Sequence, residues 1–519
     1  MAMLDERIAA GARIAPRATA LVDGERSIAW RELEALAEAR SDDLVRGGIA
    51  RGDRVLVAGP NSIETVVAIL ATLRAGATVV PLPADTRAPR LAAILADAAP
   101  AALLAPPATI ALAVDLGSTP RRVRATDGDF AGEPAALSPE RAWTARPRLA
   151  RTAGAIDADL AAILYTSGST GEPKGVMLTH SNLENTTGAI ASYLALGPDD
   201  RVALPVPVVF SYGLAQLLAA LRVGATVLLE RSFAYPFETL RRMERHAATV
   251  LVSVPTLAAR IVELLPRLEA SHPVDLRSLR AMTNAAAALP APHVARLQAL
   301  LPRTDLHLMY GQTECTRALS LDPALAGANP GSVGRAIPNC EALVVGDDGR
   351  PVAPGGEGEL VVRGANVALG YWNRPEETAR RFVPGALPGS RVLRTGDRFR
   401  VDAGGLLHFL GREDEVFKCR GEKVAPAAVE AALCSIDGVV EALVAGVPHD
   451  DDGTAIRAAL VVRPDAGLDE AAVRARCRSM LEPALVPRFV EIRPSLPRTD
   501  SGKASRRALA ASAPSSMHD

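Results

Sequence analysis

The stretch Tyr165-Thr166-Ser167-Gly168-Ser169-Thr170-Gly171-Glu172-Pro173-Lys174-Gly175 lies between two apolar runs. The run before it, 160–164, predicts a short buried strand, and a second apolar run follows at 176–180. Three glycines, four hydroxyls and one lysine leave no large side chain in the way of a ligand. Glycines let backbone N–H groups approach an anion, hydroxyls add donors, and Lys174 adds a positive charge. The stretch therefore predicts a phosphate-binding loop.

Two better-known phosphate loops do not fit this stretch. A Walker loop requires a Lys-Ser/Thr pair directly after the second glycine of G-x-x-x-x-G, and Pro173 stands five residues after Gly168. The dinucleotide fingerprint G-x-G-x-x-G does not match 168–171 either. A flexible Ser/Gly linker is the alternative. We favour phosphate binding because the stretch is short, carries a lysine and is flanked by strand-like runs.

Length and composition restrict the class of protein. A chain of 519 residues is too long for one hydrophobic core, so at least two domains are expected. The net charge of −1 gives no general attraction to nucleic acid, and we expect no nucleic-acid partner. Five cysteines form no CxxC pair, which disfavours a disulfide scaffold or a zinc site. Neither a signal peptide nor a membrane span is expected, so a cytoplasmic location is predicted.

Helix-like and strand-like segments alternate from the start to about residue 330, which is typical of layered α/β domains. Strands are expected at 54–58, 77–82, 201–209, 226–230 and 249–254, and helices at 30–46, 63–75, 87–98, 212–223, 237–246 and 255–268. From about residue 331, short alternating runs separated by Asp/Gly and Pro/Gly turns predict a small, mostly antiparallel β subdomain. Beyond a polar junction at 411–414, helix and strand segments predict a compact α+β domain of about 100 residues. The predicted domains are 1–412 and 413–519.

Four further motifs follow the loop. They are Tyr310-Gly311-Gln312-Thr313-Glu314, Arg394-Thr395-Gly396-Asp397, Gly411-Arg412-Glu413-Asp414 and the segment from Pro497 to Lys503. Together with YTSGSTGEPKGV, these motifs resemble the adenylate-forming superfamily of acyl-CoA synthetases, carrier-protein adenylation domains and luciferases. The resemblance covers residues 15 to 510. It implies a large N-terminal domain of layered α/β subdomains with a small β subdomain, and a small mobile α+β C-terminal domain.

The resemblance implies a role for each motif in using ATP. Activation of a carboxylate with ATP requires a held triphosphate, a placed Mg²⁺, a fixed sugar and base, and a cation near the α-phosphate. The implied triphosphate ligands are Thr166, Ser167, Gly168, Ser169, Thr170, Gly171 and Lys174. The implied nucleotide contacts are Tyr310 at adenine, Thr313 at phosphate, Asp397 at ribose and Arg412 at ribose and phosphate. Gly311 is also implied as a nucleotide-binding residue. Glu314 and Thr170 are implied for Mg²⁺, and Lys503 for the carboxylate and α-phosphate, so the implied catalytic groups are Thr166, Lys174, Glu314, Lys418 and Lys503.

The resemblance also implies a second half-reaction, in which the C-terminal domain turns about a hinge at Asp414. Gly421 would then let a thiol arm pass, and Lys418 would assist the acyl transfer. Four residues are expected at the acid pocket: Phe210, Tyr212, Asn284 and Cys315. Taken alone, several of these residues have ordinary explanations, such as a turn for Asp397, a solvated tail for Lys503 and core packing for Tyr212 and Cys315.

These motifs predict an AMP-forming acid–thiol ligase, with CoA as the expected thiol. A stand-alone adenylating enzyme that loads a carrier-protein phosphopantetheine arm or an amine is the alternative. A non-catalytic binding relative is disfavoured because Lys174, Glu314, Asp397 and Lys503 are all present. No aspartate occurs between residues 201 and 230, which disfavours an α-amino acid, and sparse charge near the expected pocket favours an apolar aliphatic or aryl acid.

Overall fold

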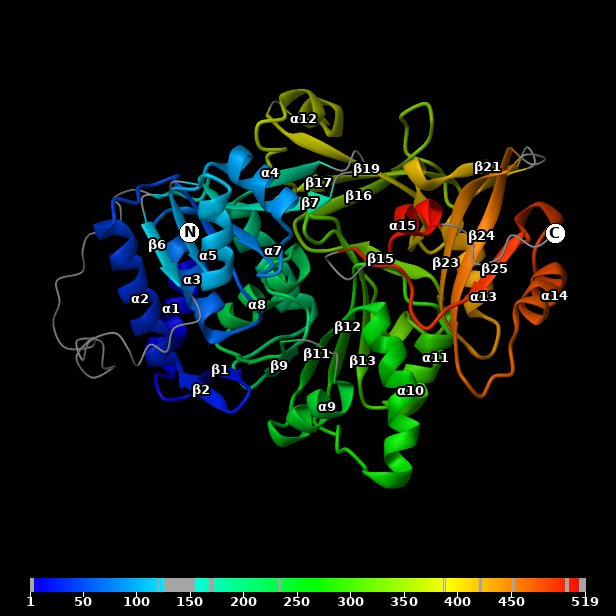
Figure 1. Ribbon diagram of the computed structural model, residues 1–519, viewed down its shortest axis with the longest axis horizontal. Coiled ribbons are helices and arrows are strands. Elements are labelled where there is room, and N and C mark those ends of the chain that lie inside the picture. The colour runs from blue at the N-terminus through cyan, green and yellow to red at the C-terminus, as the bar shows by residue number, and fades with distance from the viewer. Residues whose placement is uncertain are drawn as a thin grey trace.

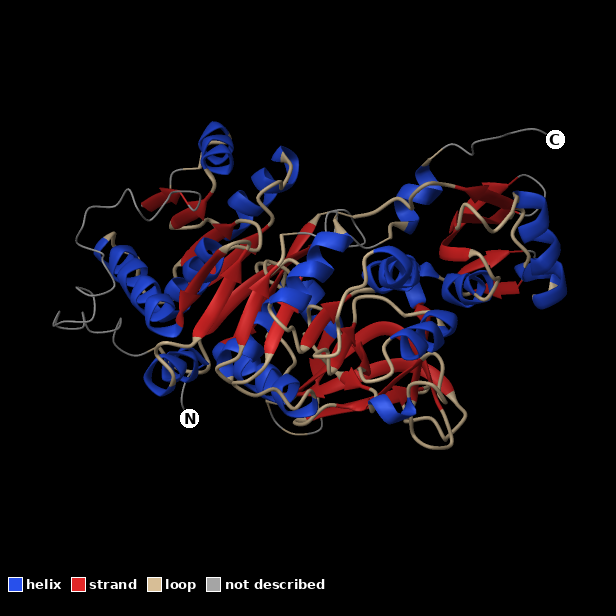
Figure 2. Cartoon of the chain, turned by 90° about the horizontal axis from the view of Figure 1, so that it is seen from below, coloured by secondary structure: helices blue, strands red, loops and turns tan. Residues whose placement is uncertain are grey.

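The computed structural model describes residues 4–118, 120, 122–125, 155–167, 172–231, 235–385, 387, 389–419, 422–449, 453–499 and 504–512. The Pro- and Arg-rich segment 138–151, for which the sequence predicts an exposed loop, lies outside these residues. Figure 1 shows the N-terminal half of the chain in layered sheets and helices, with the C-terminal part beside it. Figure 2, seen from below, shows that C-terminal part as a smaller lobe next to the larger body.

The first sheet carries the phosphate loop. Its strand order is β6-β5-β3-β4-β7-β8, and all neighbours are parallel except β7 and β8. The strands are β3 (Arg54–Ala58), β4 (Thr78–Leu82), β5 (Ala102–Ala105), β6 (Arg122–Ala125), β7 (Leu160–Ser167) and β8 (Pro173–Thr179). Helices α3 (Ile63–Arg74), α4 (Ala88–Ala98) and α5 (Pro107–Asp115) connect them. Strands β4 and β5 are buried along their whole length, as expected for a parallel sheet covered on both faces.

The second sheet begins with parallel strands in the order β13-β12-β11-β9-β10-β1, with β2 antiparallel at the edge. These strands are β1 (Thr19–Asp23), β2 (Arg26–Ala29), β9 (Arg201–Leu204), β10 (Thr226–Leu229), β11 (Val250–Ser253), β12 (Ala281–Asn284) and β13 (Asp305–Tyr310). The helices are α1 (Leu4–Ile14), α2 (Trp30–Arg46), α7 (His180–Tyr193), α8 (Ser211–Arg222), α9 (Pro236–Arg245), α10 (Pro255–Ser271) and α11 (Ala291–Leu300).

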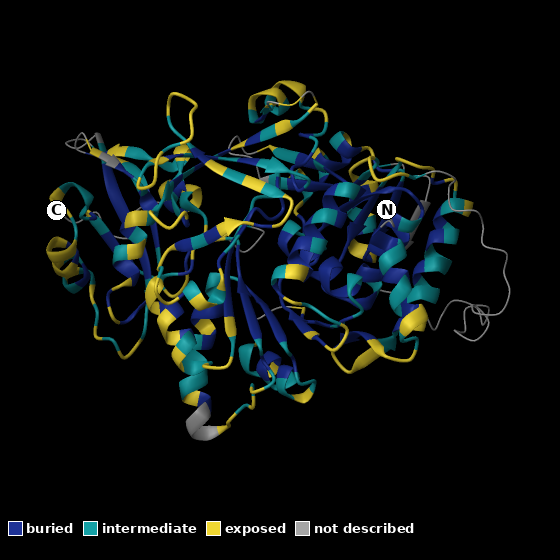
Figure 3. Cartoon of the chain, turned by 180° about the vertical axis from the view of Figure 1, so that it is seen from behind, coloured by how far each residue is buried: buried dark blue, intermediate teal, exposed yellow. Residues whose placement is uncertain are grey.

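Helices α3 and α8 lie in the main core and are apolar on nearly all sides. Almost every residue of both helices is buried, and both belong to a hydrophobic cluster that draws residues from both sheets. A helix that is apolar all round is stable only inside a protein, where each fully buried Leu or Ile side chain contributes about 1.5–3 kcal/mol. Figure 3 shows buried positions on the central strands and inner helices, and exposed positions on outer helices and turns.

The second sheet continues into antiparallel strands, which form the predicted β subdomain. These are β14 (Leu319–Ser320), β15 (Ser332–Ala336), β16 (Cys340–Val345), β17 (Glu357–Gly364), β18 (Phe382–Pro384), β19 (Arg391–Val401) and β20 (Leu407–Arg412), with helix α12 (Pro375–Arg381) and the short turns η3 (Pro323–Leu325) and η4 (Glu413–Glu415). The subdomain therefore extends the α/β sheet rather than forming a sheet of its own.

The C-terminal lobe has its own hydrophobic clusters, which draw only on residues from Phe417 onward. Its elements are β21 (Phe417–Cys419), β22 (Glu422–Val424), β23 (Val439–His449), β24 (Gly453–Val462), β25 (Phe489–Ile492), α13 (Pro426–Cys434), α14 (Glu470–Met480), α15 (Arg506–Ala511) and η5 (Pro483–Leu485). Strands β23, β24 and β25 form one sheet, and β21 pairs with β22. The predicted fold class is confirmed, while the boundary at residue 413 stays a prediction.

Two further features bear on the expectations. Among the described residues, no helix is both long enough and apolar enough to cross a membrane. All five cysteines are free thiols, and four of them are buried.

Candidate active site

The phosphate loop connects the two strands of a β-hairpin, β7 and β8. Strands β7 and β8 pair antiparallel, and Thr166 lies opposite Lys174. The two strands therefore bring both ends of the predicted loop together. The other predicted loop ligands, Gly168, Ser169, Thr170 and Gly171, lie outside the described residues.

Lys174 extends from β8 toward a tyrosine that the motifs did not identify. Its Nζ forms an ion pair with Glu377 of α12 and lies 5.9 Å from the ring centroid of Tyr371. Tyr371 is held beside the hairpin by an antiparallel bridge to Val176. The lysine is thus fixed by a carboxylate and an aromatic face in this structure.

Glu314 of the Y-G-Q-T-E motif contacts the same tyrosine, Tyr371. The Tyr371 hydroxyl donates a hydrogen bond of 2.7 Å to Glu314 Oε1. Burial raises the pKa of Tyr371, so the hydroxyl keeps its proton and acts as the donor. Tyr371 therefore brings together two groups that are far apart in sequence, the lysine of the phosphate loop and the carboxylate of Y-G-Q-T-E.

Among the described residues, no group of three or more His, Cys, Asp and Glu side chains forms a metal cage. Mg²⁺ does not require one, because it is commonly bound by one or two carboxylates together with substrate phosphates and water. Glu314 therefore fits Mg²⁺ chemistry as a single carboxylate beside a phosphate loop.

Asp397 lies at the centre of a polar cluster in the β subdomain. Its Oδ2 accepts hydrogen bonds from the Tyr310 hydroxyl at 2.6 Å and from Gln312 Nε2 at 2.8 Å. Arg412 lies opposite Asp397 in the β19–β20 register, with its Nη1 3.6 Å from Asp397 Oδ1. The Tyr310 ring packs edge-on against Phe399, with centroids 4.9 Å apart. Three predicted nucleotide residues, Tyr310, Asp397 and Arg412, are thus brought together.

One oxygen of this aspartate has no hydrogen-bond donor. Asp397 is 3% exposed, and its Oδ1 is buried without a hydrogen-bond partner. Burial raises its pKa above the ordinary value, although Arg412, Tyr310 and Gln312 favour the ionised form. A buried acceptor without a donor is unfavourable, and a sugar hydroxyl is a suitable donor. The site therefore fits the ribose that the motif predicts.

Gly311 and Thr313 of the Y-G-Q-T-E motif contact two neighbouring segments. A Cβ on Gly311 would lie 2.5 Å from the Thr316 carbonyl oxygen, so only glycine fits there. Thr313 Oγ1 is 3.3 Å from the hydroxyl of Ser211, the first residue of α8. The residue before Ser211 is Phe210, which is half-buried at the N-cap of that helix.

Tyr212 and Asn284, both expected at the acid pocket, lie at strand β12. The Tyr212 hydroxyl is 2.7 Å from Thr283 Oγ1 and donates to the Ser253 carbonyl oxygen at 3.1 Å. Asn284 follows Thr283 on β12, and its Oδ1 is buried without a partner. Cys315 is fully buried, and burial raises its thiol pKa, so it behaves as an inert apolar group.

Arg317 is a buried cation that the sequence analysis missed. It follows Glu314 by three residues and is 1% exposed, and its Cζ lies 4.9 Å from the Tyr212 ring centroid. The residue before it, Thr316, has φ of +51°, a strained conformation for a β-branched side chain that costs about 1–3 kcal/mol. Arg317 therefore adds a buried charge beside Tyr212 that the sequence analysis did not consider. The signal in the sequence was an arginine three residues after Glu314.

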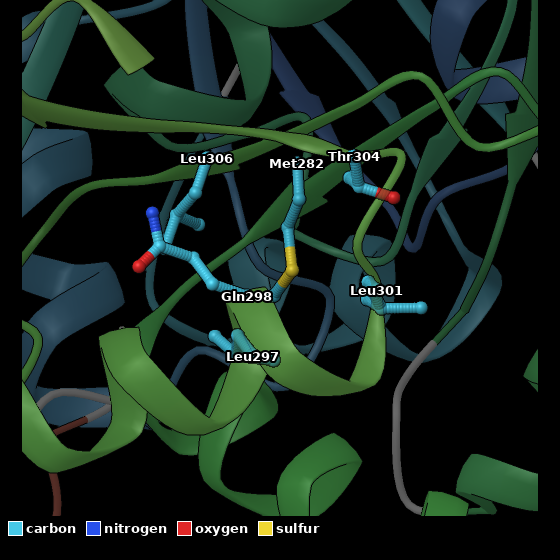
Figure 4. A pocket seen from close by; sticks show the side chains of 6 residues that line it. All are labelled: Met282, Leu297, Gln298, Leu301, Thr304 and Leu306. Carbon is cyan, nitrogen blue, oxygen red and sulfur yellow. The ribbon is translucent and has the colours of Figure 1, made fainter. Parts of the chain in front are cut away.

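A small cavity lies elsewhere, between α11 and strands β12 and β13. Figure 4 shows its lining by Met282, Leu297, Gln298, Leu301, Thr304 and Leu306. Its volume of about 10 Å³ is the space of a single water molecule. It is too small to hold an acyl group and contains none of the predicted pocket residues.

The remaining predicted residues belong to the junction and the C-terminal lobe. Arg412 Nε donates to Asp414 Oδ1 at 2.9 Å, which anchors the predicted hinge to the end of β20. Lys418 is exposed on the β21–β22 hairpin, opposite Lys423. Gly421 and Lys503 lie outside the described residues, although Arg498 and Ala504 on either side of Lys503 form a β-bridge.

Comparison with family models gives two matches. The model described as AMP-binding enzyme matches residues 8–372, and the model described as AMP-binding enzyme C-terminal domain matches residues 428–503. The two matches together include most of the predicted site.

Curated relatives fall into two groups. A 3-[(3aS,4S,7aS)-7a-methyl-1,5-dioxo-octahydro-1H-inden-4-yl]propanoyl:CoA ligase of Mycobacterium tuberculosis is 34% identical, with 95% of each chain covered. The probable non-canonical nonribosomal peptide synthetase CymA of Salinispora arenicola is 34% identical over 94% of this chain. A dimodular nonribosomal peptide synthase of Bacillus subtilis is 32% identical over 96% of this chain. The chain spans only 6% and 20% of the lengths of these two synthetases.

Solved structures show the same fold over 98% of this chain. ATP-bound MatB from Rhodopseudomonas palustris has a TM-score of 0.82 at 30% identity, with 98% of its chain covered. The anthranilate CoA ligase AuaEII in complex with anthranoyl-AMP has a TM-score of 0.86 at 25% identity, with 97% of its chain covered. The amide bond synthetase McbA from Marinactinospora thermotolerans has a TM-score of 0.83 at 27% identity, with 98% covered. These matches confirm the resemblance inferred from the motifs.

Proposed function

The chain belongs to the AMP-binding enzyme family, and from this premise we propose that it is an AMP-forming acid–thiol ligase. The observation that carries the proposal is the meeting of Lys174 and Glu314 at Tyr371. A cation from a phosphate loop and a carboxylate suited to Mg²⁺ are needed together to bind a nucleoside triphosphate.

In the first half-reaction, a carboxylate oxygen of the acid attacks the α-phosphate of ATP. The bond from the α-phosphorus to the bridging oxygen breaks, and pyrophosphate leaves with that electron pair. Thr166, the loop residues 167–171, Lys174 and Thr313 hold the triphosphate. Glu314 and Thr170 would hold Mg²⁺, which supplies charge neutralisation at the phosphates. Lys503 places its ammonium at the α-phosphate and the carboxylate, where negative charge develops.

The nucleoside is held by the cluster around Asp397. The buried Oδ1 accepts from a ribose hydroxyl, Arg412 lies at the ribose and phosphate, and the Tyr310 ring packs on adenine. Gly311 keeps this loop close to the backbone of Thr316. Because Tyr310 and Gln312 already hold Asp397 Oδ2, the carboxylate is oriented before the ligand arrives.

In the second half-reaction, a thiolate attacks the acyl carbon of the acyl-adenylate and AMP leaves. We assign the rotation of the C-terminal lobe to a hinge at Asp414. Gly421 gives room to the thiol arm, and Lys418 assists the transfer. Phe210, Tyr212, Asn284 and Cys315 line the acid pocket, with Phe210 as the gate at the start of α8.

CoA is the proposed thiol because a relative of the same length is named as a CoA ligase. Transfer to a carrier-protein phosphopantetheine arm or to an amine is the second candidate. It is favoured by the similarity to nonribosomal peptide synthetases and to an amide bond synthetase. The residues of the thiol side do not separate the two acceptors.

The test is acid-dependent ATP–pyrophosphate exchange, screened across fatty, aryl, dicarboxylic and amino acids. Each acid that supports exchange is then offered with CoA, with a phosphopantetheinylated carrier protein and with an amine. The proposal predicts exchange with at least one acid and acyl transfer to CoA. A protein that supports exchange with no acid contradicts the ligase assignment, and transfer to the carrier or amine alone contradicts CoA.

A further inference from the structure

Arg317 is a buried cation without a charge partner. Among the described residues, no ion pair includes it, and its Nε and Nη2 have no hydrogen-bond partner. Its guanidinium lies over the Tyr212 ring, with Cζ 4.9 Å from the centroid. An aromatic face attracts a cation but satisfies none of its N–H groups. Two donors therefore stay unused inside the protein.

Another arginine of the same chain shows what satisfies such a group. Arg457 is also 1% exposed, and its Nε and Nη2 lie 2.7 Å and 2.6 Å from Glu491 Oε1. Its Nη1 donates to the Leu509 carbonyl oxygen at 3.0 Å. Nε and Nη2 are the two nitrogens on one side of a guanidinium, the side that receives a carboxylate in a bidentate pair. Arg317 leaves the same two nitrogens without an acceptor.

The position of Arg317 places these donors beside the predicted acid pocket. A Cβ built on Gly311 would lie 2.9 Å from the Arg317 Cα, so the backbone of Arg317 packs against the Y-G-Q-T-E motif. Tyr212, which its guanidinium covers, is a predicted pocket residue. Gln216 lies one helical turn after Tyr212 on α8, and its buried Nε2 also has no partner. Buried donors without acceptors at Arg317 and Gln216 indicate a ligand that brings acceptors.

The charged group that influences Tyr212 is this arginine. Burial raises the pKa of Tyr212 to about 12, and Arg317 works against that shift. Thr283 of β12 contacts Tyr212, and Asn284 is the next residue of that strand. Successive side chains of a strand point to opposite faces, so the unpaired acceptor Asn284 Oδ1 lies on the face away from Tyr212. The environment of Tyr212 is therefore cationic and rich in donors.

We propose that the acid activated by this enzyme carries a second carboxylate, which Arg317 binds. This inference rests on the proposed function and names its substrate class, the dicarboxylic acids. One carboxylate attacks the α-phosphate and releases pyrophosphate, while the other keeps its charge and pairs with Nε and Nη2. An uncompensated buried cation is costly, and a substrate carboxylate removes that cost only when it is bound. The apolar or aryl monoacid expected from the sequence leaves the cation unpaired.

The experiment compares acids in pairs of equal length, such as butanoate with succinate, hexanoate with adipate, and benzoate with terephthalate. The readout is kcat/KM in acid-dependent pyrophosphate exchange by the full-length enzyme. For at least one pair, we expect the wild type to prefer the diacid by about 100-fold, the scale of one buried charge pair. Arg317→Met removes that preference and leaves the monoacid rate within about a few-fold of wild type. Arg317→Lys keeps part of the preference.

Three results overturn the inference while the ligase assignment stands. The first is exchange with monoacids and none with diacids, and the second is an Arg317→Met variant with unchanged diacid preference. The third is an equal loss for both members of a pair, which would place Arg317 at the carboxylate that reacts. Exchange with no acid at all overturns the proposed function itself.

Thermal unfolding supplies a second readout, which also controls for folding. Arg317→Met removes a buried cation that has no carboxylate partner, so its Tm in the absence of ligand should equal or exceed that of wild type. The matched control Arg457→Met removes the guanidinium that pairs with Glu491 Oε1 and should lower the Tm. The preferred diacid should raise the Tm of wild type but not that of Arg317→Met. A Tm loss for Arg317→Met equal to that of Arg457→Met overturns the inference, because Arg317 would then have a partner within the fold.

Discussion

At the scale of single residues, the Asp397 carboxylate is held by hydrogen bonds at one oxygen and has no donor at the other. Tyr310 and Gln312 hold Oδ2, and Oδ1 stays buried without a donor. Burial raises the pKa of the carboxyl group, so the protein favours the neutral form more than an unfolded chain does. A ribose hydroxyl that donates to Oδ1 would favour the ionised form instead.

This balance gives a pH-dependent prediction. Because the pKa of Asp397 is raised on folding, its contribution to stability is full below the ordinary aspartate pKa and is lost as pH rises through the raised value. ATP affinity has the opposite dependence and should weaken as pH falls through the raised pKa, with proton release on binding. Calorimetry in buffers of different ionisation enthalpy measures that release. Asp397→Asn should abolish it, and equal proton release by wild type and variant would contradict the role.

Tyr371 is the second residue with a testable role. Tyr371→Phe keeps the ring beside Lys174 but removes the hydroxyl that donates to Glu314 Oε1. We expect adenylate formation to fall by about 10-fold, the scale of a hydrogen bond to a charged group, with a higher Mg²⁺ requirement. Acyl transfer from supplied acyl-adenylate uses neither the triphosphate nor its metal and serves as the internal control. A variant that forms adenylate at the wild-type rate and Mg²⁺ dependence would rule out this role.

At the scale of elements, the turn after β13 depends on the absence of a side chain at Gly311. A methyl group there would clash with the backbone of Thr316 and Arg317. Backbone atoms cannot avoid the clash by changing rotamer, as a side chain could. Gly311→Ala should reduce the free energy of unfolding by about 1–3 kcal/mol, as overpacking does, and should displace the segment that carries Arg317. The matched control is Gly197→Ala, since a Cβ at Gly197 meets nothing within 4 Å. Chemical denaturation of both variants measures the difference, and equal stabilities would contradict the steric account.

Helix α12 restrains Lys174 through Glu377. The ion pair occupies the ammonium that the proposed function assigns to phosphate, so ATP must compete with a carboxylate. Glu377→Gln should lower the KM for ATP by about 3-fold, which is within the range of a partly exposed ion pair. Steady-state kinetics with varied ATP test this, and a raised KM would show that Glu377 positions the lysine rather than competing for it.

Local pattern predicted the elements better than their ends. The helix expected at 30–46 is α2, because its apolar residues recur with helical period. The strand expected at 201–209 stops at Leu204, since the prolines at 205 and 207 lack the N–H groups that a ladder needs. At the start of α2, Glu32 accepts a hydrogen bond from the Ala29 N–H.

The site shows the same division between local and long-range information. Asp397, Arg412 and Tyr310 were predicted because each lies in a local motif that resembles one of the adenylate-forming superfamily. Tyr371 was not, because its contact with Glu314 depends on a bridge to Val176 between distant parts of the chain. The missing partner of Arg317 likewise follows only from three-dimensional packing.

At the scale of the whole molecule, the predicted hinge lies between two differently anchored residues. Asp414 is bound by Arg412 at the end of β20. The next residue, Glu415, accepts a 2.9 Å hydrogen bond from Arg506 of α15, whose other Nη donates to Glu430 of α13 at 2.6 Å. Adjacent residues are thus tied to the larger body and to the C-terminal lobe. A rotation of the lobe would therefore change the backbone dihedral angles mainly between Asp414 and Glu415.

The central claim is that one chain performs two half-reactions with different faces of its C-terminal lobe. Lys503→Ala separates them most directly, with adenylate formation and acyl transfer from supplied acyl-adenylate measured on the same preparation. The account predicts that adenylate formation falls by about 100-fold or more, the scale of a positioned charge, while acyl transfer is retained. An equal loss of both half-reactions would contradict it.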